Sequence, residues 1–298
     1  MRRICAILVA VFCVASALTP TRLRAEERIK VVATFTILAD FVRNVGGDRV
    51  EVTALVGPDA DAHVYTPSPA DAKTIATAKL VVVNGLGLEG WLPRLVKSSG
   101  GTARMVAATD GIVPLKEAPG GHHNVDPHAW QAVPNAKIYV ENIRRALAAI
   151  DPASTETYRA NAARYRAELE ALDREVRAVV ARIPPDRRKV ISTHDAFGYF
   201  AAAYGVEFIA PLGVSTESEP SARDLAKIIA QIRKEKIPAV FLENITDPRL
   251  IRRVAAETQA KIGGTLYSDS LTDEKGGAPT YIDMVRHNIK TLQDALDK

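Results

Sequence analysis

The 298-residue chain contains little cysteine. Its two cysteines, Cys5 and Cys13, both lie in an N-terminal stretch that has the features of a cleaved export signal. The mature chain is therefore expected to contain none. Without cysteine it forms no disulfide and offers neither a thiol nucleophile nor a thiolate metal ligand. Disulfide-stapled folds, cysteine hydrolases and cysteine-based zinc sites are excluded.

The chain also lacks an excess of charge once this stretch is set aside. Residues 1–25 open with two arginines after Met1 and continue with an apolar run over residues 4–18. Small residues ending at Ala17 or Ala25 provide cleavage sites, so the segment is typical of a secretory signal peptide. Residues 1–25 hold four bases and no acid, so cleavage after Ala25 leaves 35 bases and 35 acids. This balance gives no indication of a nucleic-acid partner.

Long hydrophobic runs are missing after the signal segment. The signal's own apolar run is shorter than the ~20 residues that a membrane span needs. We therefore expect an exported, soluble protein of the periplasm. A lipid anchor at Cys13 is the alternative, but the bulky Phe12 stands before it, where a small residue is expected. We predict a protein that is not lipid-anchored.

Catalytic motifs are scarce. The chain has no G-x-S-x-G, S-x-x-K, H-E-x-x-H or Walker A sequence. The run from Gly85 to Gly90 has the glycine spacing of a dinucleotide-binding loop, but Glu89 would face the pyrophosphate and Pro93 interrupts a short helix. We interpret this run as a turn. A secreted metalloenzyme would need a general base, for which Glu217 and Glu243 are the candidates.

Strand-like and helix-like segments alternate along the mature chain, which predicts parallel sheets covered by helices. Ser68 and Asp71 form a candidate capping box at one helix start, and Asp195 is a candidate cap at another. The expected strands are residues 29–34, 50–56, 80–83, 103–107, 189–192, 206–209, 239–242 and 261–266. The expected helices in these parts are residues 37–45, 69–78, 90–97, 195–204, 221–235, 248–258 and 279–296.

Two features divide this α/β pattern. Residues 110–133 are rich in Gly, Pro, His and Asp and predict a long loop. A helix over 135–150 follows, and then a second that extends from Ser154 to Ile183. Its ~28 residues would span about 42 Å, enough to cross the molecule. The predicted segments are the signal peptide (1–25), an N-terminal α/β lobe (26–133), a helical segment with the long linking helix (134–186) and a C-terminal α/β lobe (187–298).

Three of the six histidines follow expected strands: His63, His128 and His194. Asp269 follows another. Ligands of open parallel sheets bind beyond the carboxyl ends of the strands, so these side chains, two from each lobe, would meet between the lobes. Each histidine alone is commonly a surface or hydrogen-bonded residue, and the shared location supports the prediction. Three nitrogens and a carboxylate suit a divalent ion, Zn²⁺ before others, and four protein ligands suit holding a metal better than catalysis.

The remaining histidines carry weaker expectations. His122 and His123 either collect metal transiently or lie in a solvated loop, and we favour the loop. His287 is expected to be structural or exposed. Asp126 is either an acceptor that orients His128 or a turn residue.

Five motifs carry a family resemblance: residues 61–65 (DAHVY), 84–89 (NGLGLE), 126–130 (DPHAW), 192–200 (STHDAFGYF) and 213–220 (GVSTESEP). Together they resemble the cluster A-I solute-binding proteins of zinc and manganese ABC importers, over essentially all of the mature chain. The resemblance implies two α/β lobes joined by a rigid long helix, with one metal ion buried between them. It places the ligands at His63, His128, His194 and Asp269. It also implies a non-enzymatic role, in which a periplasmic protein delivers metal to an inner-membrane ABC permease.

The chain departs from the family pattern at informative positions. Ala62 replaces a usual proline, so the first ligand loop is expected to be looser. Only His122 and His123 remain of the His-rich loop found in many zinc members. His194 stands where manganese members often have Glu, which favours Zn²⁺ over Mn²⁺. We therefore expect a zinc-binding monomer, served by a permease and also by a periplasmic metallochaperone, with a manganese-specific protein of the same family as the alternative.

Overall fold

The computed structural model describes residues 27–116, 125–218 and 220–297. The expected signal peptide, with Cys5 and Cys13, lies outside the described residues, and so do His122 and His123. No helix in the described ranges combines the length and apolar character needed to cross a bilayer.

The first sheet is parallel throughout and has the strand order β2-β1-β3-β4. Every residue of its central strand β3 is buried, as in a parallel strand covered on both faces. The capping box is present: Asp71 N donates to Ser68 Oγ at 3.4 Å, and Ser68 N donates to Asp71 Oδ2 at 2.6 Å. The elements are β1 (Ile29–Ala33), α1 (Thr36–Gly46), β2 (Val50–Ala54), α2 (Pro69–Thr77), β3 (Leu80–Val83), α3 (Leu92–Ser99) and β4 (Arg104–Ala107).

The second sheet is also parallel, and its order β6-β5-β7-β8 repeats the connectivity of the first. Thus the predicted fold of two parallel-sheet lobes is confirmed. Its elements are β5 (Lys189–Ile191), α6 (Gly198–Tyr204), β6 (Glu207–Ile209), α7 (Ala222–Glu235), β7 (Ala239–Glu243), α8 (Arg249–Thr258), β8 (Lys261–Leu266) and α9 (Tyr281–Leu296).

The prediction that Asp195 caps a helix is wrong. Helix α6 begins at Gly198, and Phe197 occupies its N-cap position. The segment after β5 instead continues to pair with the segment after β6. Leu212 N donates to the Thr193 carbonyl at 3.2 Å, and Asp195 N donates to the Gly213 carbonyl at 3.1 Å. This non-local pairing holds His194 in extended chain at the sheet edge.

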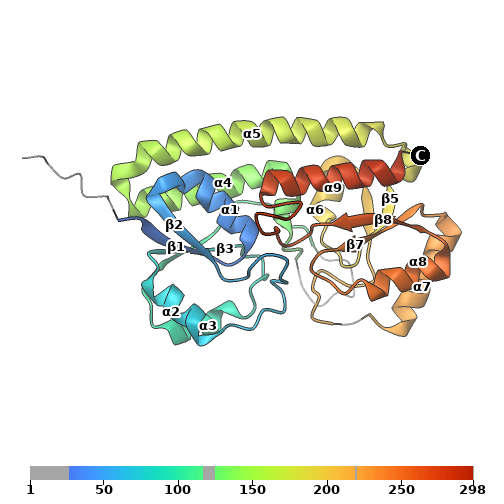
Figure 1. The fold of residues 1–298 in the computed structure, drawn as a ribbon, viewed down its shortest axis with the longest axis horizontal. Coiled ribbons are helices and arrows are strands. Elements are labelled where there is room, and N and C mark those ends of the chain that lie inside the picture. The colour runs from blue at the N-terminus through green and yellow to red at the C-terminus, as the bar shows by residue number, and fades with distance from the viewer. Residues whose placement is uncertain (1–26, 117–124, 219, 298) are drawn as a thin grey trace, which may run out of the picture.

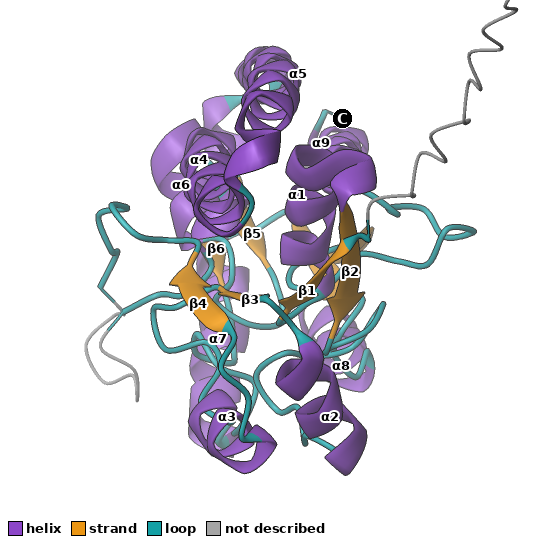
Figure 2. Ribbon diagram, turned by 90° about the vertical axis from the view of Figure 1, so that its left-hand side faces the viewer, coloured by secondary structure: helices purple, strands orange, loops and turns teal. Residues whose placement is uncertain are grey.

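Two helices connect the sheets: α4 (Val133–Ile150) and the 28-residue α5 (Thr155–Arg182), which runs along the whole molecule (Figure 1). Seen end-on, α1, α4, α5, α6 and α9 lie on one side of the strands, and α2, α3, α7 and α8 lie on the other (Figure 2). The buried residues of α5 recur every three or four positions, as an amphipathic helix requires: Tyr158, Ala162, Tyr165, Leu169, Leu172, Val176 and Val180.

An aromatic cluster joins the linking helices α4 and α5 to α1 and α9. Phe41 of α1 lies 5.7 Å from Tyr139 of α4, 6.2 Å from Tyr165 of α5 and 4.8 Å from Tyr281 of α9, measured between ring centroids. All four rings are buried. The Tyr281 hydroxyl donates to the Trp130 carbonyl at 2.6 Å. The C-terminal helix is thereby packed against the first lobe.

Candidate metal centre

Four side chains from both lobes meet between the sheets. Ligand-type atoms of His63, His128, His194 and Asp269 all lie within 4.8 Å of one another, and all four residues are buried. Each side chain lies in a segment after a strand: β2, β4, β5 and β8 respectively. The structure thus brings together every residue that the sequence predicted for the site, while their role as ligands stays a prediction.

The Asp269 carboxylate lies at the centre of the group. Its Oδ2 is 3.1 Å from His63 Nε2, 3.7 Å from His128 Nε2 and 3.2 Å from His194 Nε2, and the two nitrogens His63 Nε2 and His128 Nε2 are 3.1 Å apart. Within the described part of the chain, Asp269 Oδ1 and His194 Nε2 are buried without a hydrogen-bond partner. A buried polar atom left unpaired costs about 1–3 kcal/mol. A divalent ion would satisfy these atoms, so the group fits such an ion.

A buried glutamate holds His194. His194 Nδ1 donates to Glu243 Oε2 at 2.5 Å, and Glu243 Oε1 accepts from Thr193 N at 2.7 Å and His194 N at 2.9 Å. A carboxylate on Nδ1 fixes the tautomer that leaves the Nε2 lone pair for a ligand. The sequence suggested Glu243 only as a general base. Glu243 ends β7, which pairs with β5, and His194 follows β5. This neighbouring placement could have indicated that Glu243 contacts His194.

Asp126 holds His128 in the same way. Asp126 Oδ1 accepts from His128 N and from His128 Nδ1, both at 2.8 Å. Of the two alternatives for Asp126, the structure shows the acceptor that orients the imidazole. The Trp130 ring packs 5.3 Å from the His128 ring, and its Nε1 donates to the Ser268 carbonyl at 2.9 Å, next to Asp269.

Outside the cluster of four side chains, His63 is held through its backbone. Its N–H donates to Asp61 Oδ1 at 2.8 Å, and the preceding Ala62 carbonyl accepts from Trp91 Nε1 at 2.9 Å. No residue of the described ranges forms a hydrogen bond with its Nδ1. The ring therefore lacks the Nδ1 carboxylate that orients the other two, and its side-chain contacts are those of Nε2 within the cluster.

The carboxylates control protonation in the group. Burial lowers the pKa of His63. Burial also opposes the charge on His128, but Asp269 and Asp126 outweigh it and raise its pKa to about 9. Burial is outweighed at His194 too, where Glu243 and Asp269 raise the pKa well above 6.5. At Asp269 the neighbouring imidazolium charges overcome burial and hold the pKa well below 3.8. The carboxylates thus favour the protonated form of the imidazole at both His128 and His194.

The glycine-rich run from Gly85 to Gly90 forms a turn, as the sequence predicted. The Glu89 carboxylate accepts from Asn84 N at 2.6 Å, Gly85 N at 3.2 Å and Thr34 Oγ1 at 2.7 Å. Gly85 and Gly87 adopt left-handed φ angles of 85° and 84°. The amides that a pyrophosphate would need are already bonded to the chain's own carboxylate.

The other candidates lie away from the group or are already engaged. Glu217 is exposed, and Glu243 accepts three hydrogen bonds, so neither is a free base. His287 pairs its Nε2 with the Thr265 carbonyl at 2.9 Å, and its ring centroid lies 4.6 Å from that of Tyr267, which confirms a structural role.

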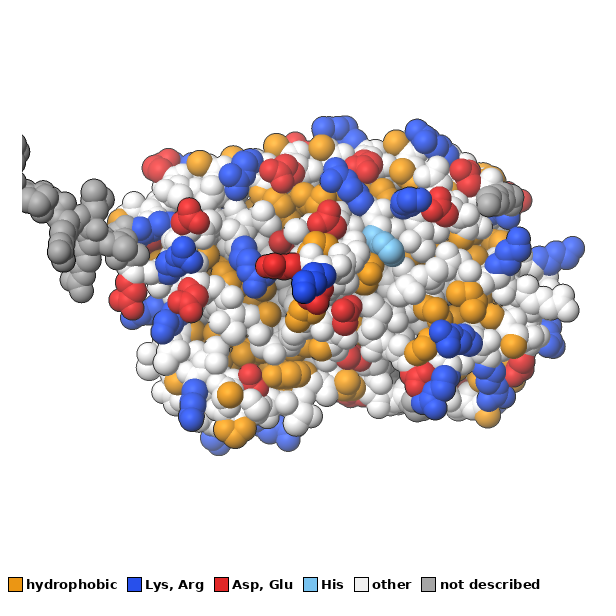
Figure 3. Space-filling view, in the orientation of Figure 1, with side chains coloured by type: hydrophobic (Ala, Val, Ile, Leu, Met, Phe, Trp, Pro, Cys, Tyr) orange, Lys and Arg blue, Asp and Glu red, His pale blue; other side chains and the backbone are white. Residues whose placement is uncertain are grey.

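Acidic and basic side chains are interspersed over the face of the molecule in Figure 3.

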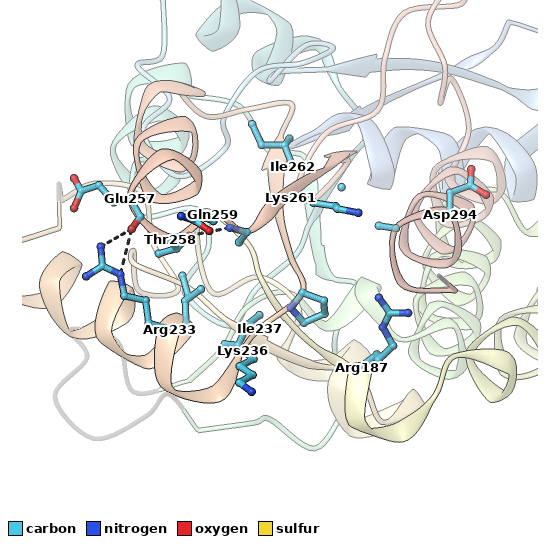
Figure 4. Close-up of a pocket in the computed structure, with 15 residues that line it drawn as sticks. Arg187, Arg233, Lys236, Ile237, Glu257, Thr258, Gln259, Lys261, Ile262 and Asp294 are labelled. Carbon is cyan, nitrogen blue, oxygen red and sulfur yellow. Dashed lines mark hydrogen bonds between the residues drawn. The ribbon is translucent and has the colours of Figure 1, made fainter.

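A cavity of about 920 Å³ lies elsewhere in the C-terminal lobe, where α7, α8 and α9 end near the start of β8 (Figure 4). Arg187, Arg233, Lys236 and Lys261 line it, and none of the four clustered side chains does. The Arg233 guanidinium donates to the Glu257 carbonyl near the end of α8. Cations at helix C-termini stabilise carbonyls that have no partner within the helix. Arg233 is thereby accounted for by the end of α8.

Known proteins share both the sequence and the fold. Residues 31–295 match the ZnuA family model, described as zinc-uptake complex component A, periplasmic. The iron-binding protein YfeA of Yersinia pestis is 38% identical over 89% of this chain and 86% of its own length. The manganese-binding lipoprotein MntA of Bacillus subtilis is 34% identical over 91% of both chains. The periplasmic zinc-binding protein TroA of Treponema pallidum superposes with a TM-score of 0.86 at 32% identity, over 91% of this chain and all of its own.

The family match runs through both lobes and the linking helix, and relatives above 30% identity align along nearly the full length of each partner. The metals in the names of these relatives differ, whereas their role in metal binding is shared. The chain therefore belongs to the ZnuA family of periplasmic solute-binding proteins, the metal-binding components of ABC transporters, and is not an enzyme.

Proposed function

We propose that the chain captures one Zn²⁺ ion between its lobes and delivers it to its permease. His63, His128 and His194 would bind through Nε2, and Asp269 through its carboxylate. The observation that carries the proposal is the convergence of three Nε2 atoms on one buried carboxylate, with two of the rings oriented by further carboxylates. The ion is cargo, so no reaction at the site is required.

Zinc is favoured by the chemistry of the donors. Three imidazoles and one carboxylate match the ligands that Zn²⁺ prefers, whereas Mn²⁺ prefers sites richer in oxygen. The alternative is Mn²⁺, and two observations favour it. Several relatives are named for manganese, and the free Asp269 Oδ1 would let the carboxylate bind through both oxygens.

Elemental analysis of the purified protein, followed by competition titration with Zn²⁺ and Mn²⁺, tests both statements. We expect one Zn²⁺ per chain and tighter binding of Zn²⁺ than of Mn²⁺. His63→Ala and His194→Ala should abolish or greatly weaken binding. His287→Ala, which removes an imidazole outside the cluster, should leave it unchanged. Normal metal content and affinity in both cluster variants would contradict the proposal.

The remaining expectations concern export and partners. We propose a monomer that is processed after Ala17 or Ala25 without acylation at Cys13, because Phe12 disfavours lipid attachment. Intact mass and sedimentation measurements test these points. A mature mass that includes an acylated Cys13 would overturn the first, and a concentration-independent dimer would overturn the second. A metallochaperone as the source of the ion would accelerate metal loading of the purified apo protein.

A further inference from the structure

The three imidazoles of the site differ in how they are restrained. Carboxylates bond to Nδ1 of both His128 and His194, whereas the His63 ring has no such partner among the described residues. The position of His63 therefore depends on its loop, residues 57–63. Ala62 leaves the backbone of this loop less restricted than a proline would. Of the three rings, His63 is the one that no carboxylate holds through Nδ1, so only its Nε2 contacts inside the cluster and its loop position it.

Asp61 connects this loop to the opposite lobe. Its Oδ1 accepts from His63 N at 2.8 Å, and its Oδ2 accepts from the Thr216 hydroxyl at 2.5 Å. Thr216 lies 155 residues further along the chain, in the segment after β6. A single carboxylate thus joins the backbone of a candidate ligand to a side chain of the C-terminal lobe. Hydrogen bonds to a charged acceptor are stronger than those between neutral groups.

Other contacts hold the start of the loop. Asn244 Nδ2 donates to Asp59 Oδ1 at 2.9 Å, and Asp59 N donates to the Leu271 carbonyl at 3.1 Å. These bonds act four residues before His63 and would persist while Asp61 and His63 move. The bond from Thr216 acts on the carboxylate that holds the His63 amide. Outside the cluster itself, this bond acts closer to His63 than the Asp59 contacts do.

We propose that the Thr216 hydroxyl is a latch that positions Asp61, and through it His63, and so sets the rate at which bound metal dissociates. The inference rests on the proposed function, because it takes His63 as a ligand. Release begins when the bond between Thr216 and Asp61 breaks and His63 leaves the ion. His128 and His194 stay oriented by their carboxylates, ready for the next ion. Thr216 touches no metal and is a positioning residue.

Stopped-flow transfer of Zn²⁺ from the loaded protein to an excess of chromogenic chelator measures dissociation directly. Thr216→Val keeps the shape of the side chain and removes the hydroxyl. We expect dissociation about tenfold faster, equivalent to about 1.4 kcal/mol, with association and thermal midpoint of the apo protein nearly unchanged. Thr216→Ser restores the hydroxyl and should dissociate at nearly the wild-type rate. Thr258→Val removes a hydroxyl that bonds only to backbone at the end of α8, to the Val254 carbonyl and the Ala260 amide, and serves as the matched control.

The outcomes separate the latch from the proposed function. One Zn²⁺ per chain, fast release in Thr216→Val and slow release in Thr216→Ser support the latch. A wild-type rate in Thr216→Val, or equal acceleration in both Thr216 variants, would overturn it while leaving the metal site intact. Unaltered Zn²⁺ affinity in His63→Ala would instead contradict the assignment of His63 as a ligand, and the latch with it.

Discussion

Lowering the pH from about 9 to about 7 should weaken metal binding, although ordinary imidazoles are already neutral throughout this range. The pKa of His128 is raised to about 9, and that of His194 is raised well above 6.5. A metal ion binds only the neutral ring, so it must displace both protons. His63 and Asp269 contribute no proton, because their pKa values are lowered. Affinity should therefore rise with pH up to the raised pKa values.

The expected magnitude follows from the number of protons displaced. Each proton released per ion changes the dissociation constant by about tenfold per pH unit, or about 1.4 kcal/mol. Two imidazolium protons give about a hundredfold per unit below the raised pKa values. Three unperturbed imidazoles would give an affinity that levels off above about pH 7.5. The sequence alone implies an affinity that levels off in this way. The buried carboxylates move the pH at which it levels off to higher values.

Chelator competition at a series of pH values gives the slope, and calorimetry in buffers of different ionisation enthalpy counts the protons. Glu243→Gln keeps an acceptor oxygen but removes one of the two charges that raise the pKa of His194, so this pKa should fall and fewer protons should be released per ion. Glu257→Gln, at an exposed glutamate of the same lobe, should match the wild type. An affinity that is constant across this pH range, or a release well below one proton per ion, would refute the reasoning.

Three further predictions concern stability. Burial raises the pKa of Asp40 to about 6 from 3.8, so folding takes up a proton between these values and stability falls as the pH rises through them. In Asp40→Asn this fall, about 3 kcal/mol, should disappear from urea unfolding, and an undiminished fall would count against it. Phe41→Ala removes the centre of the aromatic cluster and should cost about 3–5 kcal/mol in the same assay. A loss under 1 kcal/mol would show that the cluster is not tightly packed. Ser221→Ala removes the α7 N-cap bond to Asp224 N and should cost about 1 kcal/mol, whereas an unchanged midpoint would argue that the cap adds nothing.

Local patterns predicted most of the elements. The run Leu80–Val83 is uninterrupted and apolar, so it is a strand whatever its neighbours are. The capping box of Ser68 and Asp71 closes within one helical turn and was found for the same reason. The start of α6 was missed because the segment around His194 pairs with Leu212, which is distant in sequence. A cap motif carries no information about such a competing bond.

The features of the site can also be separated into those that local sequence predicts and those that long-range contacts decide. The sequence by itself determined which residues could bind an ion. His63, His128, His194 and Asp269 follow strands of two parallel sheets, and ligands bind beyond the carboxyl ends of such strands. It also determined the absence of thiolates, which leaves nitrogen and oxygen as donors. The sequence could not determine how firmly each ligand is held.

Only the tertiary structure decided that question. Glu243 reaches His194 from 49 residues away, and Thr216 reaches Asp61 from 155 residues away. Such partners are brought together by the packing of two sheets along one long helix, and no spacing in the chain records it. The long-range contacts therefore raise the pKa values of His128 and His194 and restrain the loop of His63. The types of donor atom, in contrast, follow from the sequence alone.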